Sequence, residues 1–561
     1  MRKHSKNTGA GARTLVKPWT RWRGRRIAFL AALVLLCNVA GGRAASGVAA
    51  TPDDIRRATH LLENATFGPT AADITAVLTL GRDNWIAQQF ALPESQMPDG
   101  LDTNQVRSQL FLNMANGADQ LRQRIMFALS QTIVVSANKT GSGPELIPWL
   151  RLLSRNAFGN YKTLITEVTL SPTMGKYLDL AYSRKASSSS SPNENYPREL
   201  MQLFTIGLWE LNMDGTRRLD SQNQPIPTYT QQTVREFSRA LTGWTFPTMP
   251  GATPANSNPQ YFVGQMEPRT TTHDTATKTL FNGVTLPANQ TTTNDMLAVI
   301  DNVFQHANVP PFVATRLIRS LVTSNPSPDY IERVATVFAN NGEGVRGDLK
   351  AVIRAVLTDP EAVRFSSSSA GRLKDPVLHA IGFGRALGAR ITDPNQFMYI
   401  FSNLSQRVLT PTTVFSFYSP LAMLPGGSGL YGPEFQIYPP ALAVQRANFI
   451  YSILANWFGA AYAVDLAPFQ AVASSPATLA TKVDHALMFG RMSADLRATI
   501  ITATSAVPAS NTRERAFGAI YLAATSSEYS VSADNTGDGI ASLVLSADTC
   551  LLYTSPSPRD S

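Results

Sequence analysis

Residues 347–357 read Gly-Asp-Leu-Lys-Ala-Val-Ile-Arg-Ala-Val-Leu, and this stretch decides the fold class. Its apolar side chains recur three and four positions apart, at Leu349, Val352, Ile353, Val356 and Leu357. On a helix of 3.6 residues per turn this spacing forms one apolar stripe. Asp348 stands at the expected N-cap, and Pro360 follows the expected end. The stretch therefore predicts an amphipathic helix that buries one face.

Helical patterns of the same kind extend over most of the chain. The preceding segment starts with Ser327 as N-cap and Pro328 at the first helical position, and it stops at Gly342. Similar patterns lie near 53–64, 71–79, 104–135, 145–168, 198–210, 230–242, 293–306, 310–323, 374–388, 440–458 and 512–524. The alternation typical of strands is scarce. We predict an all-α (mostly α-helical) fold: a single large multi-helix globular domain with long irregular loops and little strand.

Three stretches interrupt the helical pattern. Residues 187–192 are a serine run that ends in proline, which predicts a flexible polar loop. Residues 245–290 are rich in Pro, Thr, Asn and Gly, and so long a segment without regular structure is usually functional or mobile. Residues 408–440 combine glycines with aromatic residues. No internal repeat or composition shift marks a further domain boundary.

The positive charge of the chain is concentrated at its N-terminus. The 561 residues include 49 Lys and Arg and 40 Asp and Glu, a net charge of +9. Ten of the basic residues and none of the acidic ones lie within residues 1–45, which leaves 39 basic against 40 acidic residues. The remainder therefore lacks the positive field that binds nucleic acid or an anionic membrane.

Residues 1–50 have the layout of a secretory signal peptide. A basic segment ending at Arg26 precedes an apolar run from Ile27 to Cys37, and small residues follow as candidate cleavage sites. The run is too short to cross a bilayer core of roughly 30 Å as a helix. We predict an exported protein, periplasmic or extracellular, with no membrane span after signal removal; an uncleaved anchor is the alternative.

The other end of the chain is unusual. Residues 549–561 resemble translated sequencing adaptor, so we predict a non-native or disordered tail over 531–561 and a single α-helical domain over 51–530. Cys37 lies in the signal and Cys550 in the tail. The domain between them therefore has no disulfide, thiolate zinc site or cysteine nucleophile.

Several strings of the chain resemble one bacterial family. They are Ala-Thr-Phe-Gly-Pro-Thr at 65–70, Leu-Arg-Gln-Arg at 121–124, the segment 193–207 that begins Asn-Glu-Asn-Tyr, Ala-Leu-Thr-Gly-Trp at 240–244, His-Asp at 273–274, Pro-Glu-Phe-Gln at 433–436 and Glu-Tyr at 528–529. On these strings the chain resembles the domain of unknown function 1800 family. The resemblance implies a large exported bacterial protein of unassigned biochemical role, with a sulfatase-like exported protein as a working partner.

The Asn-Glu-Asn-Tyr segment offers the first candidate site. Pro197 suits the first turn of a helix, where exposed N–H groups favour anions. Glu194 and Glu199 flank Arg198. Two carboxylates beside a guanidinium could hold a metal, orient a hydroxyl-rich substrate or act as an acid–base pair. The alternative is a buried polar network that only joins neighbouring helices.

The helix over 230–242 offers a complementary surface. Arg235 and Arg239 are spaced to share one helical face, next to Glu236. If this face turns inward, its arginines complement the two glutamates of the first site. Structural ion pairing is the alternative.

His273 and Asp274 on the long loop are candidates for a general base or a metal ligand. Adjacent side chains rarely chelate one ion, so further ligands would come from Asp179, Glu194 or Glu199. No established metalloprotease or nucleophile motif accompanies the pair. Loop-anchoring hydrogen bonds are the alternative.

Two functions are compatible with these patterns. A hydrolase acting on an envelope or extracellular polymer would use Glu194, Arg198, Glu199, Glu236, His273 and Asp274 as catalytic residues, with a divalent metal as candidate cofactor and no nucleotide or haem signal. A non-catalytic binding or assembly module would present the aromatic segment 408–440 to a sulfatase-like partner or a polymeric glycan. Convergence of Glu199, Glu236 and His273 in one solvent-reachable pocket favours the enzyme, and separate buried ion pairs favour the module.

Overall fold

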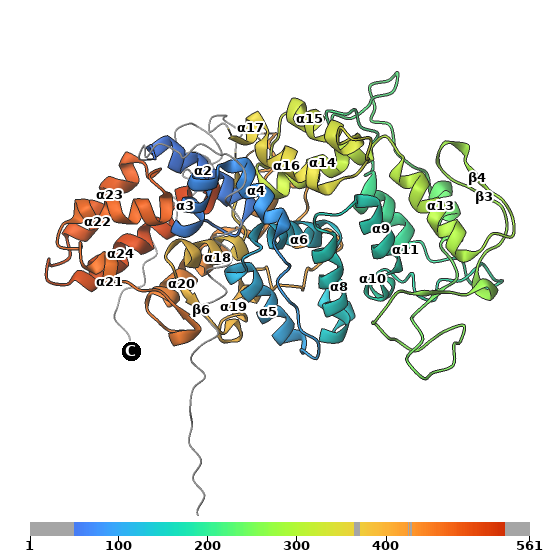
Figure 1. Ribbon diagram of the computed structural model, residues 1–561, viewed down its shortest axis with the longest axis horizontal. Helices are drawn as coiled ribbons and strands as arrows, with labels where there is room; N and C mark the ends of the chain where they lie inside the picture. Colours follow the sequence, from blue (N-terminus) through green and yellow to red (C-terminus); the bar gives the residue numbers. More distant parts are fainter. Residues whose placement is uncertain (1–49, 364–370, 425, 427–428, 533–561) are drawn as a thin grey trace, which may run out of the picture. The chain divides into compact units, whose positions relative to one another are not determined.

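The computed structural model describes residues 50–363, 371–424, 426 and 429–532 (Figure 1). The predicted signal segment up to residue 49 and the predicted tail from residue 533 lie outside these residues. Helices make up 55% of the chain and strands 6%, which confirms the all-α prediction. Among the described residues, no helix is both long and apolar enough to cross a membrane.

Side-chain hydrogen bonds cap the N-termini of the first helices of the described chain. The hydroxyls of Thr51 and Thr70 each accept the N–H of an aspartate three residues on, and that aspartate accepts the N–H of the threonine. The predicted helix over 104–135 is two helices, because the chain turns at Gly117. The helices of this part are α2 (Pro52–Ala65), α3 (Ala71–Leu80), α4 (Arg82–Ala91), α5 (Thr103–Asn116), α6 (Gln120–Thr132), α7 (Ala137–Thr140), α8 (Gly143–Asn156), α9 (Tyr161–Leu170) and α10 (Pro172–Tyr177).

The middle of the chain contains the stretch that decided the fold class. It folds as α16, with Asp348 accepting the N–H groups of Lys350 and Ala351, and its apolar stripe is buried against α14 and α15. Figure 1 shows these three helices side by side. The elements here are α11 (Asn195–Glu199), the π-helix η1 (Leu200–Thr205), α12 (Gln231–Ala240), the 3-10 turns η2 (Thr270–Thr272) and η3 (Phe281–Gly283), α13 (Thr292–Phe304), α14 (Val309–Leu321), α15 (Pro328–Ala339), α16 (Leu349–Thr358) and α17 (Pro360–Val363).

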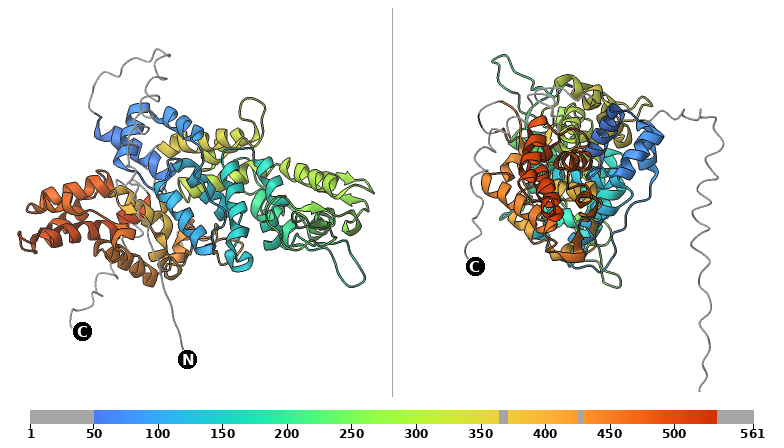
Figure 2. Two further views of the ribbon diagram at one scale, coloured as in Figure 1. Left: turned by 60° about the horizontal axis from the view of Figure 1, so that its bottom comes forward. Right: turned by 90° about the vertical axis from the view of Figure 1, so that its left-hand side faces the viewer.

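The C-terminal helices include a group in which α22, α23 and α24 pack on one another (Figure 2). The sequence pattern predicted only the last of these three, because α22 and α23 bury few large side chains. The elements of this part are α18 (Pro376–Ala386), η4 (Pro394–Gln396), α19 (Ile400–Asn403), η5 (Pro433–Ile437), α20 (Pro440–Leu454), η6 (Gly459–Ala461), α21 (Ala467–Gln470), α22 (Pro476–Val483), η7 (Asp484–Met488), α23 (Ala494–Ser505), α24 (Thr512–Thr525) and α25 (Ser527–Ser530).

The strands described are two residues long and close loops rather than form a layer. They pair antiparallel as β1 (Trp244–Thr245) with β2 (Glu267–Pro268), β3 (Lys278–Thr279) with β4 (Thr285–Leu286), β5 (Arg372–Leu373) with β8 (Val531–Ser532), and β6 (Arg390–Ile391) with β7 (Tyr462–Ala463). Strand β8 lies two residues beyond the predicted end of the domain. Strands β2, β3 and β4 lie within residues 245–290, so this long segment has local structure of its own.

The segment 408–440 turns its aromatic rings toward buried arginines. Tyr431 lies 3.9 Å from the guanidinium of Arg319, and Tyr438 lies 4.4 Å from that of Arg446. Phe415 is 41% exposed, but Tyr431 and Tyr438 are only partly exposed. The prediction that this segment presents its aromatics to a partner stays a prediction.

Candidate functional site

The start of α11 forms the first of three separate polar networks. Arg198 donates to Glu194 at 2.8 Å, four residues earlier. The side-chain amide of Gln231, the first residue of α12, donates to both oxygens of Glu194 at 3.0 and 2.9 Å. Arg198 also donates to the side-chain amide oxygen of Gln231 at 3.2 Å. The network joins the starts of two helices and is partly open to solvent.

The second network ties α12 to the long loop through Arg239. Its Nε donates to Asp274 at 2.9 Å and its Nη1 to Glu236 at 2.9 Å. The N–H of Thr279 donates to Glu236 at 3.1 Å. Burial would raise the pKa of Asp274, but the hydrogen bonds from Arg239 and the Ala276 N–H, together with nearby positive charge, outweigh it and the pKa is lowered. Arg235 is exposed, so Arg239 alone makes these contacts.

The third network surrounds His273, which is fully buried. Its Nδ1 lies 2.8 Å from the carbonyl oxygen of Thr242, and its Nε2 lies 3.0 Å from Asp295 on α13. Lys278 donates to the same Asp295 oxygen at 2.6 Å. Gly243 lies against this histidine, and a Cβ there would come within 2.8 Å of the His273 Cβ. His273 thus anchors the long loop, and its side chain does not reach solvent.

Glu199 differs from the other predicted residues. Its Oε2 is buried without a hydrogen-bond partner. Burial raises the pKa of Glu199, and the positive charge of Arg198 opposes this only in part. Tyr177 and Tyr229 are close enough for the charge of Glu199 to raise the pKa of both hydroxyls, after burial as the main cause. Of the predicted acids, Glu199 keeps an oxygen free for a proton or a ligand.

Both predicted segments contact α12, but Glu236 and His273 are engaged in separate pairings, with Arg239 and Asp295. Within the residues that the structure covers, no group of three or more His, Cys, Asp or Glu side chains is placed to hold a metal ion. The catalytic roles assigned to these residues stay predictions.

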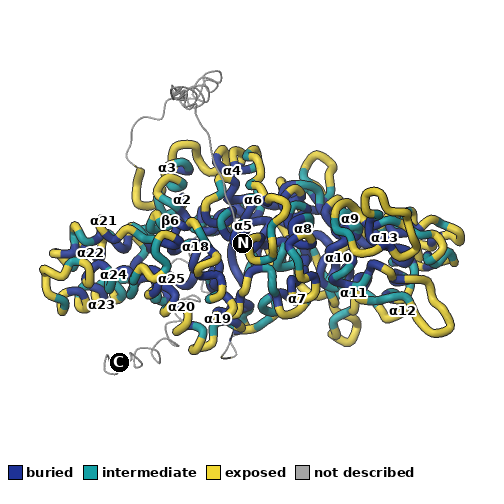
Figure 3. Tube along the Cα trace, turned by 90° about the horizontal axis from the view of Figure 1, so that it is seen from below, coloured by how far each residue is buried: buried dark blue, intermediate teal, exposed yellow. Residues whose placement is uncertain are grey.

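A groove along α8 was not predicted. One face of this helix forms its wall, with residues three and four positions apart: Pro144, Ile147, Pro148, Arg151, Leu152 and Arg155. The opposite side comes from the loop around Asp99, from the α9–α10 junction at Ser171, and from the loop 263–265. Figure 3 shows α8 beside α9 and α10. The groove has a volume of ≈ 490 Å³.

Two ion pairs bridge the groove walls. Arg151 lies 2.9 Å from Asp99 and donates twice to the carbonyl oxygen of Met97. Arg155 lies 2.6 Å from Glu167 on α9. The two arginines also line a second cavity of ≈ 200 Å³, in which Gln123 has a buried Oε1 without a hydrogen-bond partner.

Pro148 shapes the backbone of this wall. A proline inside a helix has no N–H, so the carbonyl of Pro144, four residues earlier, lacks its usual donor. Pro144 and Pro148 both line the groove. The one signal in the sequence was a proline in the middle of a helical pattern whose arginines and apolar residues share a face.

Comparison with known proteins adds the family. The sequence profile described as "Protein of unknown function (DUF1800)" matches residues 60–531. Neither a curated protein nor a solved structure matches the chain. The match covers nearly the whole described chain and confirms the resemblance drawn from the short strings. The chain belongs to the DUF1800 family.

Proposed function

We propose that the protein is an exported binding module that holds a segment of an envelope or extracellular glycan in the α8 groove. The observation that carries this proposal is a helix face, 144–155, that borders an open groove of ≈ 490 Å³. That volume lies within the range of roughly 300–1,000 Å³ typical of ligand sites. The separate ion pairs of Glu236 and His273 favour binding over hydrolysis.

The lining of the groove suits a neutral chain that carries hydroxyl groups. Its charged side chains already neutralise one another, because Arg151 pairs with Asp99 and Arg155 with Glu167. An ionic ligand would have to disrupt these pairs. The apolar part of the wall can pack on the CH face of a sugar ring, and the Pro144 carbonyl can accept a hydrogen bond from a hydroxyl.

The place of action and the partner belong to the same proposal. A leader with the layout of a signal peptide supports export to the periplasm or the extracellular space. The family resemblance supports a sulfatase-like exported protein that acts beside the module. The near-balanced charge after the leader argues against nucleic acid as the ligand.

Titration of the exported protein against a panel of neutral polysaccharides tests the groove. Val263 is 62% exposed on the groove wall, so Val263→Asp places a carboxylate there with little risk to folding. We expect at least a tenfold loss of affinity, about 1.4 kcal/mol. Val345→Asp is the matched control, since Val345 is 41% exposed on a different loop. Equal affinities of the two variants would contradict the groove assignment.

Glu199 supports a hydrolase as the second candidate, because one of its oxygens is buried, unpaired and easier to protonate than usual. The same panel, extended to esters and peptides and run with and without divalent metals, would reveal product release. A general acid at this position predicts that Glu199→Gln abolishes turnover and leaves binding in the groove intact. Full activity in that variant would end this alternative.

A further inference from the structure

A cluster of buried charged side chains lies where α6, β5, the start of α18, η5 and α20 meet. Its members are 0 to 4% exposed and come from distant parts of the sequence: Arg124, Arg372, Asp375, Glu434 and Arg446. Arg124 and Glu434 belong to two of the strings that carry the family resemblance. None of the five lines the α8 groove.

One ion pair and shared backbone carbonyls connect members of the cluster. Arg124 and Arg372 both donate to the carbonyl oxygen of Ser320, near the end of α14. Arg372 lies 3.6 Å from Glu434. Arg446 donates to the carbonyl of Lys374, next to Asp375 in the chain, at 2.7 Å. These contacts hold three guanidinium groups around two carboxylates.

The guanidinium groups have more donors than the described chain has acceptors for them. Arg124 donates only through Nη2, and its Nε and Nη1 are buried without a partner. Arg446 donates through Nη1, and its Nε and Nη2 are likewise buried without a partner. A buried N–H that loses its bond to water and gains none destabilises the fold, and more so when it is charged. The cluster has four such nitrogens and only one unpartnered buried acceptor, Oε2 of Glu434, so the protein supplies too few acceptors for these donors.

The two carboxylates do not balance the charge. One oxygen of Asp375 caps α18 by accepting the N–H of Leu378, and the other accepts weakly from Gln131 and Tyr418. Burial raises the pKa of Glu434 to about 7, although Arg372 lies beside it. Near neutral pH, three guanidinium charges therefore face fewer than two full negative charges. A buried excess of positive charge is costly unless an anion offsets it.

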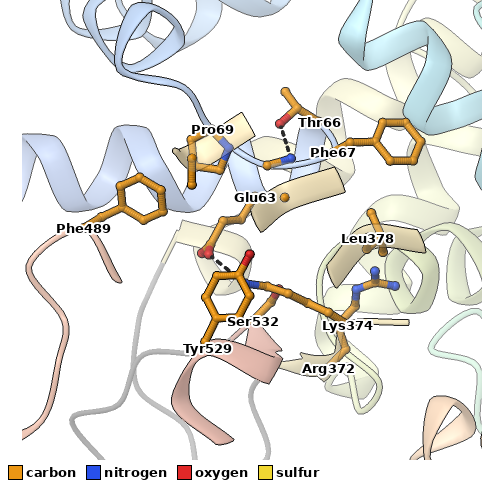
Figure 4. A pocket seen from close by; sticks show the side chains of 13 residues that line it. Glu63, Thr66, Phe67, Pro69, Arg372, Lys374, Leu378, Phe489, Tyr529 and Ser532 are labelled. Atoms are coloured by element: carbon orange, nitrogen blue, oxygen red, sulfur yellow. Dashed lines mark hydrogen bonds and ion pairs between the residues drawn. The ribbon is translucent and has the colours of Figure 1, made fainter. Parts of the chain in front are cut away.

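The neighbouring ion pairs of Glu63 are arranged differently from this cluster. Figure 4 shows the amino group of Lys374 directed at Glu63 and Tyr529, whereas the guanidinium of Arg372 points away from them. Glu63 lies 2.8 Å from Arg491 and 3.6 Å from Lys374, so both cations contact this carboxylate directly. The cavity there leaves ≈ 20 Å³, room for about one water molecule. Each cation of this adjacent site therefore has a carboxylate partner, which Arg124 and Arg446 do not have.

We propose that the protein binds one small inorganic anion, a halide or an oxyanion, in this buried cluster at the unpartnered nitrogens of Arg124 and Arg446. The anion accepts hydrogen bonds from the unpartnered guanidinium nitrogens, and such charge-assisted bonds are about twice as strong as neutral ones. Because both arginines are almost fully buried, the ligand is an ion of a few atoms and not a polymer end. The site is independent of glycan binding in the α8 groove.

Thermal unfolding of the whole exported protein tests the site. Unfolding is followed in sodium gluconate and in chloride, bromide, phosphate or sulfate at equal ionic strength. We expect at least one of these anions to raise the Tm by about 2 °C or more over gluconate, because a ligand that binds only the folded state stabilises it. The chloride and bromide arms identify a halide, and the phosphate and sulfate arms identify an oxyanion.

Arg124→Gln should abolish this anion-dependent rise in Tm. Arg385→Gln is the control, since Arg385 is also buried but donates to Gly68, Ala115 and Asp73 with all three nitrogens. It should lower the Tm and keep the rise. Equilibrium dialysis of the wild-type protein with the labelled ion should give one ion per chain, even if the Arg124 variant does not fold. No rise with any anion, an equal rise in the Arg124 variant, or no bound ion would overturn the proposal.

Discussion

Single side chains show how strongly burial changes chemistry in this protein. Glu434, in the interior, has a pKa of about 7, whereas Glu63, also buried but paired with Arg491 and Lys374, has a pKa of about 2 despite the opposing effect of burial. The same residue type is thus close to neutral in one place and firmly charged in another. The difference comes from how many cations contact each carboxylate and how closely.

Glu434 makes the stability of the fold depend on pH. Its folded pKa of about 7 exceeds its ordinary value of 4.5, so the folded state keeps a proton that the unfolded chain has already lost. Stability from this group is therefore complete below pH 4.5 and is lost as the pH rises through 7. We expect a loss of about 3 kcal/mol between pH 4.5 and 8, and Glu434→Gln should remove it.

Urea unfolding at pH 5, 6, 7 and 8, in gluconate, measures this difference between wild type and Glu434→Gln. The exposed Glu514→Gln is the control and should follow the wild type. A Glu434→Gln profile parallel to that of the wild type would show that the carboxyl group is already ionised in the folded protein at pH 5.

Asp295 tests the structural role of the His273 network. Asp295→Asn takes the negative charge away from the fully buried Lys278 and should destabilise the protein by roughly 3–5 kcal/mol. Asp301→Asn on the same helix removes the exposed partner of Lys162 and should cost under about 1 kcal/mol. Denaturant unfolding compares the two. Equal, small losses would mean that the loop does not depend on this network.

At the scale of helices and loops, apolar periodicity predicted the helices that bury one regular apolar face and missed those that do not. It found α16 and its cap, because a regular apolar stripe reports one buried face. It joined α5 to α6, because only three residues separate two helices with continuous apolar character. It missed α22 and α23, whose small and β-branched residues give a weak stripe.

The candidate site was less predictable than the helices. The sequence offered only the conditional idea that the 230–242 helix complements Glu194 and Glu199, and no pattern indicated which side chain pairs with which. The α8 groove depends on how α8 sits against loops at residues 99 and 263, more than a hundred positions apart in the chain. Such an arrangement leaves no local pattern, because each segment looks like an ordinary helix or loop by itself.

Replacing Pro148, the proline inside α8, should weaken glycan binding and raise the free energy of unfolding of the protein. Pro148→Ala restores an N–H to the Pro144 carbonyl, so the free energy of unfolding should rise by up to about 3 kcal/mol. The same change takes an acceptor away from the groove and should weaken glycan binding. Urea unfolding and ligand titration on one preparation measure both. Lower stability with unchanged affinity would show that the proline does not shape the groove.

For the whole molecule, the polar networks and the proposed glycan groove lie on different elements. The networks of Glu194, Glu236 and His273 fasten the long loop and α12 to the rest of the chain. The groove lies along another helix, between ion pairs that leave no net charge. In the function that we propose, this member of the DUF1800 family holds a neutral chain rather than cleaving it.

Amide hydrogen exchange with a panel glycan bound tests the location of binding most directly. We expect slower amide exchange in residues 144–155 and 263–265 when the glycan is present. Exchange should not change in residues 194–199, nor in the parts of 231–279 outside 263–265. Protection confined to the segments of Glu199, Glu236 and His273 would contradict the account and place the ligand at the acids first predicted from the sequence.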